Sequence, residues 1–352
     1  MNDAARPDGY LISEDARLDA RNTFGVAARA PLLVEVADVD ALPAVFADPR
    51  LRDRPVLVLG GGSNLLFAGD PDGAVLALTG TDVRIVEDHG DHAIVRADAG
   101  GQWHALVLWS LDQGLSGLEN LALIPGTVGA APIQNIGAYG VEVRERIHAV
   151  EAFERATGKT WRLSAEDCAF AYRDSRFKHE PERFVVTAVE FALPRTSALR
   201  LEYAGIGEEL AAMGVEESPT AAQVAEAVSS IRRRKLPDPA RIGNAGSFFK
   251  NPIVALAQAE DLQAQHPALP VFGTSDADMR KLSAAWLIDQ CGWKGHRDGD
   301  AGIAGSHALV LVNHGRASGA QLLALARRVS ASVHERFGVA LEPEPRIIGD
   351  NW

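Results

Sequence analysis

The chain has 352 residues, of which 47% are hydrophobic and 23% charged, and its formal net charge is −12 at pH 7. One hydrophobic core rarely serves so long a chain, so these values indicate a soluble globular protein of two or three domains. The acidic balance argues against a nucleic-acid binder, which would present a basic face, but it leaves room for a small anionic ligand.

Cysteine and histidine patterns give no sign of a disulfide framework or a metal site. Cys168 and Cys291 lie far apart, and none of the ten histidines belongs to an HExxH pair. We therefore expect a reducing compartment and no metal. No apolar run reaches the roughly 20 residues of a membrane span, and the N-terminus lacks the apolar region of a signal peptide. We expect a cytoplasmic protein without a membrane or nucleic-acid partner.

The chain alternates short apolar runs with polar breaks. Residues 1–20 read as a loosely ordered lead-in. Runs rich in β-branched residues predict buried strands, and apolar residues at helical spacing predict helices. The predicted strands are 32–36, 55–59, 74–78, 93–97, 149–153, 184–191 and 309–312. The predicted helices are 38–46 with Asp38 as N-cap, 102–111, 275–290, and one from Ser318 to Gly338.

A glycine loop, Gly60-Gly61-Gly62, follows the strand predicted at 55–59. Successive glycines let backbone N–H groups converge into a nest that holds pyrophosphate oxygens, and Ser63 and Asn64 add side-chain donors. The loop is neither a G-x-G-x-x-G fingerprint nor a Walker loop. It is also compatible with a tight turn between strands.

A second stretch of small residues lies between residues 124 and 140. Small residues usually mean that another surface lies against the backbone, either a ligand or a packed element. Two such stretches in one domain favour a large, flat cofactor. The residues that we single out are Ile124, Pro125, Gly126, Gln134, Asn135, Ile136 and Gly137.

Basic residues mark two further stretches. The segment from Tyr172 to Lys178 carries two arginines and a lysine, which suit a clamp on a carboxylate or phosphate, or a solvated loop. A helix predicted from Thr220, with Gln223 as its capping-box partner, ends in the run 232–235. Cationic side chains complement the helix dipole at its C-terminal end, but four in a row are more than that role requires. We place a domain boundary near 215–220.

The stretch from Gly243 to Pro252 is where we expect chemistry. Its glycines let the backbone approach a ligand, and Ser247, Lys250 and Asn251 supply a hydroxyl, a cation and an amide. Two phenylalanines between them would anchor the stretch on a core. The alternative is an aromatic-pinned turn with incidental polar neighbours.

As an ordered set, these motifs are similar to those of the bacterial UDP-N-acetylenolpyruvoylglucosamine reductases. The resemblance covers essentially residues 20–349, in the family's order. Any one motif is weak, whereas the ordered set is specific. The matching stretches are 22–25, 60–64, 117–119, 124–126, 134–140, 172–175, 243–252, 286–290 and 341–344.

The resemblance implies an α+β fold in three domains. Residues 1–84 and 85–217 would form two FAD-binding subdomains of the p-cresol methylhydroxylase-like type. Residues 218–352 would form an α+β substrate-binding domain whose last residues return Glu344 to the flavin. Gly60 to Asn64 would hold the pyrophosphate of a non-covalent FAD, and the segment 124–140 would lie along the flavin.

The resemblance also implies a reaction. In this family NADPH passes a hydride to FAD, which delivers it to C3 of the enolpyruvyl group of UDP-N-acetylglucosamine enolpyruvate. The product, UDP-N-acetylmuramate, serves peptidoglycan synthesis and thus cell-wall biogenesis and division. By resemblance Ser247 gives a proton to C2 and Arg173 stabilises charge on the carboxylate. Glu344, rather than Glu342, matches the family's catalytic glutamate.

Four residues would contact the substrate by the same resemblance. Tyr203 lies on a stretch similar to a loop that folds over the substrate in one variant of the family, and Tyr172 precedes Arg173. Lys235 and Asn251 match contacts to the UDP diphosphate. The chain departs from the family's usual pattern at 204–207, after the tyrosine, and at 284–285, where Ala-Ala stands for Ala-Gly.

Two other functions stay compatible with these residues. One is an FAD-dependent oxidase of the same fold that acts on a sugar or alcohol. Covalent-flavin members generally need a His or Cys attachment site, and none is evident near 60–64. The other is a catalytically silent nucleotide-sugar sensor, against which Ser247, Arg173 and Glu344 argue. We expect a monomer whose small-molecule partners are NADPH and the UDP-linked enolpyruvate.

Overall fold

The computed structural model describes residues 9–215 and 217–352, which divide into two compact units. Unit 1 comprises the residues up to Ala16 together with Ala30–Gly61 and Asp72–Arg234. Unit 2 comprises Arg17–Arg29, Gly62–Pro71 and Lys235–Trp352. Each unit is therefore assembled from segments far apart in the sequence. The domain boundaries expected at 84 and 217 stay predictions.

One sheet of unit 1 has four strands, in the order β1 (Tyr10–Arg17), β2 (Arg29–Val36), β5 (Ala74–Leu78) and β3 (Val56–Val58). Both β2 and β3 pair parallel with β5. A parallel strand that is covered on both faces reads as a continuous apolar run, as β5 does. Between β2 and β3 lie η2 (Val39–Ala41) and α1 (Leu42–Ala47).

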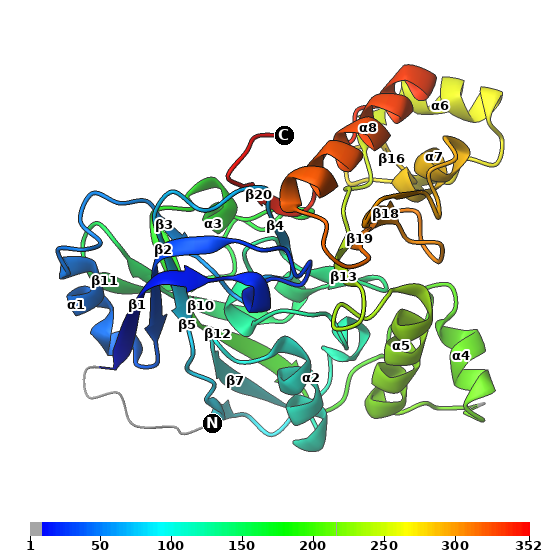
Figure 1. The fold of residues 1–352 in the computed structure, drawn as a ribbon. Coiled ribbons are helices and arrows are strands. Elements are labelled where there is room, and N and C mark those ends of the chain that lie inside the picture. The colour runs from blue at the N-terminus through cyan, green and yellow to red at the C-terminus, as the bar shows by residue number, and fades with distance from the viewer. Residues whose placement is uncertain (1–8, 216) are drawn as a thin grey trace. The chain divides into compact units, whose positions relative to one another are not determined.

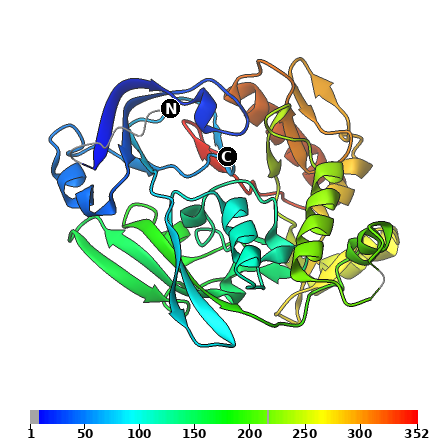
Figure 2. The ribbon, with the colours of Figure 1, turned by 90° about the horizontal axis from the view of Figure 1, so that it is seen from below.

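The second sheet of unit 1 has five strands, and each neighbouring pair is antiparallel. The order is β11 (Lys159–Ser164), β10 (Ile147–Glu154), β12 (Phe184–Pro194), β7 (His92–Asp98) and β6 (Val83–Asp88). Figure 1 labels β7, β10, β11 and β12 of this sheet. In Figure 2 the cyan hairpin of β6 and β7 lies beside the green strands. Helix α2 (Trp103–Asp112) packs on this sheet, and the Trp103 ring meets Phe191 of β12 at 5.9 Å between centroids. Both rings are fully buried.

The long connection between α2 and β10 contains only short regular elements. They are η3 (Glu119–Leu121), η4 (Val128–Ala130), β8 (Gly137–Ala138), β9 (Val141–Glu142) and η5 (Val143–Glu145). The rest of unit 1 is α3 (Arg176–His179), α4 (Ile206–Ala212) and α5 (Ala221–Lys235), whose last residue belongs to unit 2. Apolar residues of α4 and α5 join the core that covers the five-stranded sheet.

Unit 2 is built on small sheets. The first has the order β13 (Gly243–Ser247), β19 (Val310–Asn313), β18 (Ala301–Ile303) and β17 (Arg297–Asp298). The second has the order β14 (Ile253–Ala255), β16 (Met279–Leu282) and β15 (Val271–Gly273), and a third pairs β20 (Arg346–Ile348) with β4 (Leu65–Phe67). Its helices are η1 (Asp19–Arg21), α6 (Leu256–Gln265), α7 (Ala284–Gln290) and the long α8 (Gly319–Phe337), orange-red in Figure 1.

Two expectations from the sequence are wrong. Residues 10–17 form β1 instead of a loose lead-in, because pairing with β2 satisfies their backbone groups; residues 1–8 lie outside the described residues. The helix expected at 275–290 is β16 followed by α7. β16 pairs with strands on both sides, and Ser283 starts α7 by accepting a hydrogen bond from the Trp286 N–H. The short apolar pattern of this stretch fits both a helix and a strand, and pairing with neighbouring strands decides between them.

The helix caps expected from the sequence are confirmed. The Thr220 hydroxyl accepts a hydrogen bond from the Gln223 N–H at 3.2 Å, and the Gln223 side chain accepts one from the Thr220 N–H at 2.8 Å. Ser318 caps α8, which ends at Gly338 with φ 65°. Such caps depend on neighbours in the sequence, which is why a sequence predicts them. None of the helices in the described ranges is long and apolar enough to cross a membrane.

Candidate active site

Gly60 and Gly61 lie directly against the small-residue segment that follows α2. A Cβ on Gly60 would come 2.6 Å from the hydroxyl oxygen of Thr127, and a Cβ on Gly61 would come 2.9 Å from Cα of Gly126. Neither position accepts a side chain without movement of its neighbour. The two glycine-rich stretches singled out in the sequence therefore form one feature of unit 1.

These four residues, Gly60, Gly61, Gly126 and Thr127, present backbone donors and are called the phosphate cradle below. None of the described residues accepts a hydrogen bond from their N–H groups. The Gly126 carbonyl, by contrast, accepts a hydrogen bond from the Trp103 N–H at 3.0 Å, which ties the segment to α2. The N–H groups of the cradle are therefore open to solvent or to a ligand, and N–H groups that converge in such a nest bind phosphate oxygens. The cradle therefore fits the pyrophosphate of a dinucleotide such as FAD.

Asn135, a predicted cofactor residue, uses its side chain to hold the fold. Its side chain is fully buried, and Nδ2 donates to Glu142 Oε2 and to the Ala171 carbonyl, both at 3.0 Å. Its Oδ1 accepts a hydrogen bond from the Arg144 N–H at 3.1 Å. Because protein atoms engage this amide, Asn135 holds the segment in place. Ile124, Pro125, Gln134 and Ile136 belong to the same segment.

Arg173 lies against Gly137, another predicted cofactor residue of unit 1. Nη2 of Arg173 donates to the Gly137 carbonyl at 2.6 Å. The guanidinium also lies over the Tyr172 ring, 5.4 Å from its centroid. Arg173 has φ 54°, which is uncommon for a bulky residue, and the Lys178 ammonium donates to its carbonyl at 2.8 Å. Unit 1 thus places the predicted carboxylate-binding arginine beside the predicted flavin segment.

Tyr203 is tied to the same segment of unit 1. Its ring is 48% exposed and meets the Tyr139 ring edge to face, at 5.1 Å between centroids. The buried Asn120 holds the two stretches together, because Nδ2 donates to the Tyr139 carbonyl at 3.0 Å and to the Arg200 carbonyl at 2.9 Å. The exposed ring is therefore available to a ligand while its backbone is anchored.

In unit 2, three stretches singled out in the sequence come together around β13. The Asn244 N–H donates to the Thr23 carbonyl at 2.9 Å, and the Thr23 N–H donates to the Gly62 carbonyl at 3.1 Å. A Cβ on Gly243 would lie 2.1 Å from the Phe24 carbonyl oxygen, and one on Gly62 would lie 2.0 Å from a carbonyl oxygen of η1. Close packing of main chain therefore requires both glycines.

Ser247 stands at the end of β13, directly after a β-bulge. The register against β19 shifts between Asn244 and Ser247, where Gly246 has φ 69°. The Asn244 side chain holds this bulge by accepting a hydrogen bond from the Gly246 N–H at 3.0 Å. A bulge re-aims the side chain that follows it. The Ser247 hydroxyl forms no hydrogen bond with the residues that the structure describes, so it is available to a ligand.

Glu344 is attached to the same strand end. Phe248 and Phe249, which are each 1% exposed, anchor the stretch as expected. The Glu344 N–H donates to the Phe248 carbonyl at 2.8 Å, and Phe249 forms a β-bridge with Pro343. These backbone contacts bring the segments of Ser247 and Glu344, two residues predicted to act together, next to each other in unit 2.

The two glutamates of the tail differ in their surroundings. The Glu342 side chain is 71% exposed and pairs with the Lys250 ammonium at 2.9 Å. The Glu344 carbonyl instead accepts a hydrogen bond from the Asn64 amide at 3.4 Å, and the Arg346 N–H donates to the Asn64 carbonyl at 3.0 Å. The parallel pairing of β20 with β4 produces this contact between the glycine loop and the tail.

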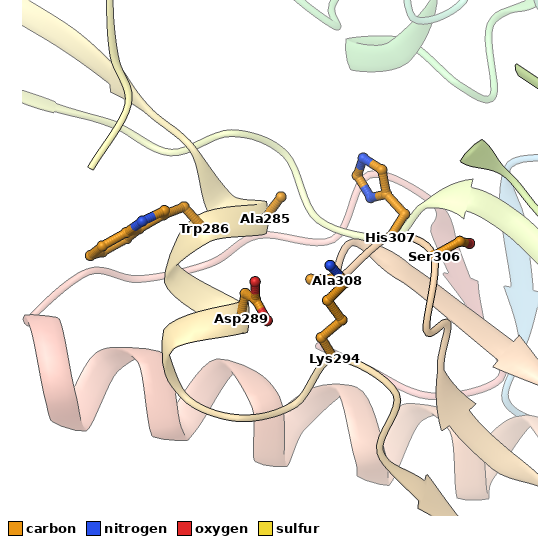
Figure 3. A pocket seen from close by; sticks show the side chains of 7 residues that line it. All are labelled: Ala285, Trp286, Asp289, Lys294, Ser306, His307 and Ala308. Carbon is orange, nitrogen blue, oxygen red and sulfur yellow. The ribbon is translucent and has the colours of Figure 1, made fainter. Parts of the chain in front are cut away.

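A pocket of about 180 Å³ lies in unit 2, and Figure 3 shows its lining. Burial lowers the pKa of His307, and the charges of Lys235 and Lys294 lower it further. A neutral imidazole beside two cations suits an anionic or strongly polar ligand. The lining residues are Ala285, Trp286, Asp289, Lys294, Ser306, His307 and Ala308.

Asn251 lies next to this pocket. Its side-chain oxygen accepts a hydrogen bond from the Ala284 N–H at 3.0 Å, at the start of α7. One of its polar atoms therefore serves the fold. The position agrees with a contact to a ligand in the pocket through the amide nitrogen.

Two family models match the chain. Residues 30–164 match an FAD binding domain, and residues 238–348 match the C-terminal domain of UDP-N-acetylenolpyruvoylglucosamine reductase. The chain is 60% identical over 344 residues to the UDP-N-acetylenolpyruvoylglucosamine reductase of Xanthomonas oryzae pv. oryzae strain PXO99A, covering 98% of both chains. The chain belongs to this reductase family.

Further relatives agree. The reductase of Xylella fastidiosa strain M12 is 57% identical over 346 residues, again with 98% of both chains covered. The crystal structure of the reductase from Thermus caldophilus has a TM-score of 0.65 and 26% identity, over 96% of this chain and 98% of that chain. The predicted family and the predicted combination of an FAD-binding module with a C-terminal α+β domain are thus confirmed. The roles of single site residues stay predictions.

The sequence alone did not point to several residues that shape this protein's candidate site. It did not single out Asn244, which holds the bulge before Ser247, or Asn120, which anchors the stretch before Tyr203. It also passed over Lys294 and His307 of the pocket. An Asn two residues before a glycine is a turn signal that points to Asn244. The other three depend on contacts with distant segments, which no local pattern reveals.

Proposed function

We propose that this protein reduces UDP-N-acetylglucosamine enolpyruvate to UDP-N-acetylmuramate, with FAD as cofactor and NADPH as hydride donor, in peptidoglycan precursor synthesis. The observation that carries the proposal is full-length identity of 57–60% to proteins named as this reductase. The phosphate cradle adds a site whose donors fit a dinucleotide. Reduction and FAD binding follow from family membership, and the residue roles below extend them.

When bound, FAD would supply the hydride chemistry that links NADPH to C3 of the enolpyruvyl double bond. Its pyrophosphate would be held by the cradle together with Gly62, Ser63 and Asn64, and the segment from Ile124 to Gly137 would line the flavin. The glycine packing at 60–61 keeps the main chain close enough for N–H donation.

Ser247, Arg173 and Glu344 would carry the chemistry on the substrate. Arg173 suits the substrate carboxylate, where negative charge grows as C3 gains the hydride, because its planar fork pairs oxygens two at a time. Ser247 would then transfer its hydroxyl proton to C2. Glu344, attached next to Ser247 through the Phe248 carbonyl, would position that transfer.

Four further residues would bind the rest of the substrate. Tyr203 presents a half-exposed ring, Tyr172 lies under the Arg173 guanidinium, and Lys235 and Asn251 are both linked to the pocket in unit 2. A cation and amide donors suit a diphosphate. We further propose a monomeric, cytoplasmic enzyme that serves cell-wall biogenesis, cell shape and division.

The test is NADPH oxidation by the purified FAD-loaded protein. We expect a rate that depends on UDP-N-acetylglucosamine enolpyruvate, a yellow protein with an FAD spectrum, and UDP-N-acetylmuramate as product. Oxygen consumption is the second readout. Oxygen consumption that a sugar or alcohol drives in the absence of the UDP-linked enolpyruvate would identify an oxidase instead. Folded protein that takes up no FAD would overturn the proposal.

A further inference from the structure

The turn that carries Arg173 is closed by a pair of main-chain hydrogen bonds. The Ala171 N–H donates to the Asp174 carbonyl at 3.1 Å, and the Asp174 N–H donates to the Ala171 carbonyl at 3.2 Å. Tyr172 and Arg173 are thus the two central residues of a four-residue turn. Arg173 has φ 54°, and glycine or asparagine normally fills a second central position of this kind. A bulky residue persists there only if its surroundings support it.

Two side chains hold the ends of this turn to the predicted flavin segment. Asn135 Nδ2 donates to the Ala171 carbonyl at 3.0 Å, and Ser175 Oγ donates to the Ile133 carbonyl at 2.6 Å. Both side chains lie in the interior, since Asn135 is 0% and Ser175 1% exposed. These bonds fix where the turn begins and ends. They leave open what fixes Arg173 at its centre.

Lys178 supports the centre of the turn. Its Nζ donates to the Arg173 carbonyl at 2.8 Å. Lys178 lies on α3, labelled in Figure 1, which is anchored by Phe177, 4% exposed and edge to face with Phe184 at 6.0 Å between centroids. A hydrogen bond from an ammonium is charge-assisted and stronger than one between neutral groups. Because it fixes the carbonyl of Arg173, this bond restrains the backbone from which the arginine side chain extends.

The backbone conformation of Arg173 determines where its guanidinium lies. From this turn the side chain reaches the Gly137 carbonyl, to which Nη2 donates at 2.6 Å, and covers the Tyr172 ring. With an ordinary negative φ, Cβ would leave the turn in another direction, and the side chain would lose this place. A planar fork pairs both oxygens of a carboxylate only when it is held in the right position and orientation.

We propose that Lys178 is a positioning residue for Arg173, whose guanidinium it keeps in place for the carboxylate of the substrate. That Arg173 pairs with this carboxylate rests on the proposed function. The cations of the stretch 172–178 therefore divide their tasks. Arg173 presents its guanidinium beside the predicted flavin segment, whereas Lys178 holds the main chain behind it.

The test compares Lys178→Met with Lys159→Met, which changes an exposed lysine of β11, in FAD-loaded protein. Titration calorimetry measures the dissociation constants of UDP-N-acetylmuramate, which carries a carboxylate, and of UDP-N-acetylglucosamine, which carries none. For Lys178→Met we expect UDP-N-acetylmuramate to bind about 5- to 20-fold more weakly, as for a lost hydrogen bond to a charged group. UDP-N-acetylglucosamine should change by less than about 2-fold, and Lys159→Met should alter neither value by more than that.

A double-mutant cycle shows whether Lys178 acts through Arg173. Arg173→Gln should itself weaken UDP-N-acetylmuramate selectively, because the fork for the carboxylate is gone. Adding Lys178→Met to Arg173→Gln should then change the affinity by less than about 2-fold, since coupled residues are not additive. A lysine that contacted the ligand itself, or that only stabilised the fold, would produce the same loss in both backgrounds.

Unchanged affinity of Lys178→Met for UDP-N-acetylmuramate would overturn the inference, as would equal weakening of both ligands or an additive loss in Arg173→Gln. If Lys178→Met does not fold, Lys178→Gln keeps a polar end that is one bond too short for the carbonyl and should show the same selective loss; unchanged affinity would overturn the inference again. Substrate-dependent NADPH oxidation by the wild type tests the proposed function separately. A selective effect of Lys178 without turnover would remove the proposed reaction and leave the role of Lys178 in place.

Discussion

The two units offer their candidate residues in different ways. In unit 1 the phosphate cradle is main chain, and the positions of Gly60 and Gly61 leave no room for a side chain. In unit 2, Gly62 and Gly243 are more crowded still, by the protein's own carbonyl groups. The groups suited to chemistry there are side chains on paired strands, Ser247 and the neighbouring Glu344.

This difference teaches that a glycine-rich stretch is not in itself a ligand site. What matters is whether the N–H groups beside the glycine have protein acceptors. Those of the cradle have none among the described residues, whereas the Gly246 N–H is taken by the Asn244 side chain. Loss of a side chain should therefore impair the chemistry proposed for unit 2, whereas a Cβ added at Gly60 or Gly61 should impair the backbone donors of the cradle in unit 1.

The largest effect is expected for Ser247→Ala. Substrate-dependent NADPH oxidation should fall about 10²- to 10⁴-fold, the usual contribution of a positioned proton donor. Loss of the FAD colour on addition of NADPH alone should proceed as in the wild type, measured by stopped-flow absorbance. Ser318→Ala, which removes the cap of α8, is the control and should cost only about 1 kcal/mol of stability. Equal slowing of both half-reactions by Ser247→Ala would exclude the proton-donor role.

Glu344→Gln should have the next largest effect, compared with Glu342→Gln two residues earlier. We expect turnover to drop about 10²-fold for Glu344→Gln, since the neutral amide cannot position the proton transfer in the same way. Glu342→Gln breaks only an exposed ion pair with Lys250, worth about 0–1 kcal/mol, and should leave steady-state rates near wild type. Similar losses in the two variants would contradict the assignment of Glu344.

Gly61→Ala tests the cradle. The added Cβ would lie 2.9 Å from Cα of Gly126, so it should push the two backbone stretches apart and misdirect their N–H groups. We expect FAD to bind about 10- to 100-fold more weakly, measured by fluorescence titration of the apoprotein. Gly207→Ala in α4 has open space around its Cβ and should stabilise the helix by about 0.5–1 kcal/mol without affecting FAD. Undiminished FAD affinity of Gly61→Ala would rule out the cradle.

The smallest effect concerns pH and distinguishes the units through their cysteines. Burial raises the pKa of Cys168 in unit 1 to about 12, against about 8.5 for an unfolded thiol. Because the folded value is the higher one, this group's stabilising contribution is complete below pH 8.5 and is lost as the pH rises toward 12. Unfolding by urea should show a loss of roughly 2 kcal/mol between pH 8.5 and 10 that Cys168→Ala lacks.

Thiol alkylation gives an independent measurement of the same difference. At pH 8 the half-buried Cys291 of unit 2 should react before the fully buried Cys168. Mass spectrometry of the alkylated peptides identifies which thiol was modified. Faster labelling of Cys168 in the native protein would show that unit 1 opens first.

Local sequence patterns were sufficient to predict several helices, caps and strands of this protein. The capping pair of Thr220 and Gln223, the capped helix from Ser318 to Gly338 and the buried strand at 74–78 depend on residues close in the sequence. The order of the motifs was sufficient to identify the family, because so many matches in one order do not arise by chance. The same resemblance singled out Ser247 and Glu344, whose roles stay predictions.

Contacts between distant segments decided the rest. Residues 279–282 form a strand because β14 and β15 flank them, although their own pattern suited a helix. Glu344 meets Asn64, 280 residues earlier in the chain, only because β20 pairs with β4. Arg232 and Arg233 are adjacent and chemically identical, yet only one faces a buried carbonyl and phenol. A side chain's partners and desolvation are properties of its surroundings, and only the folded chain brings those surroundings together.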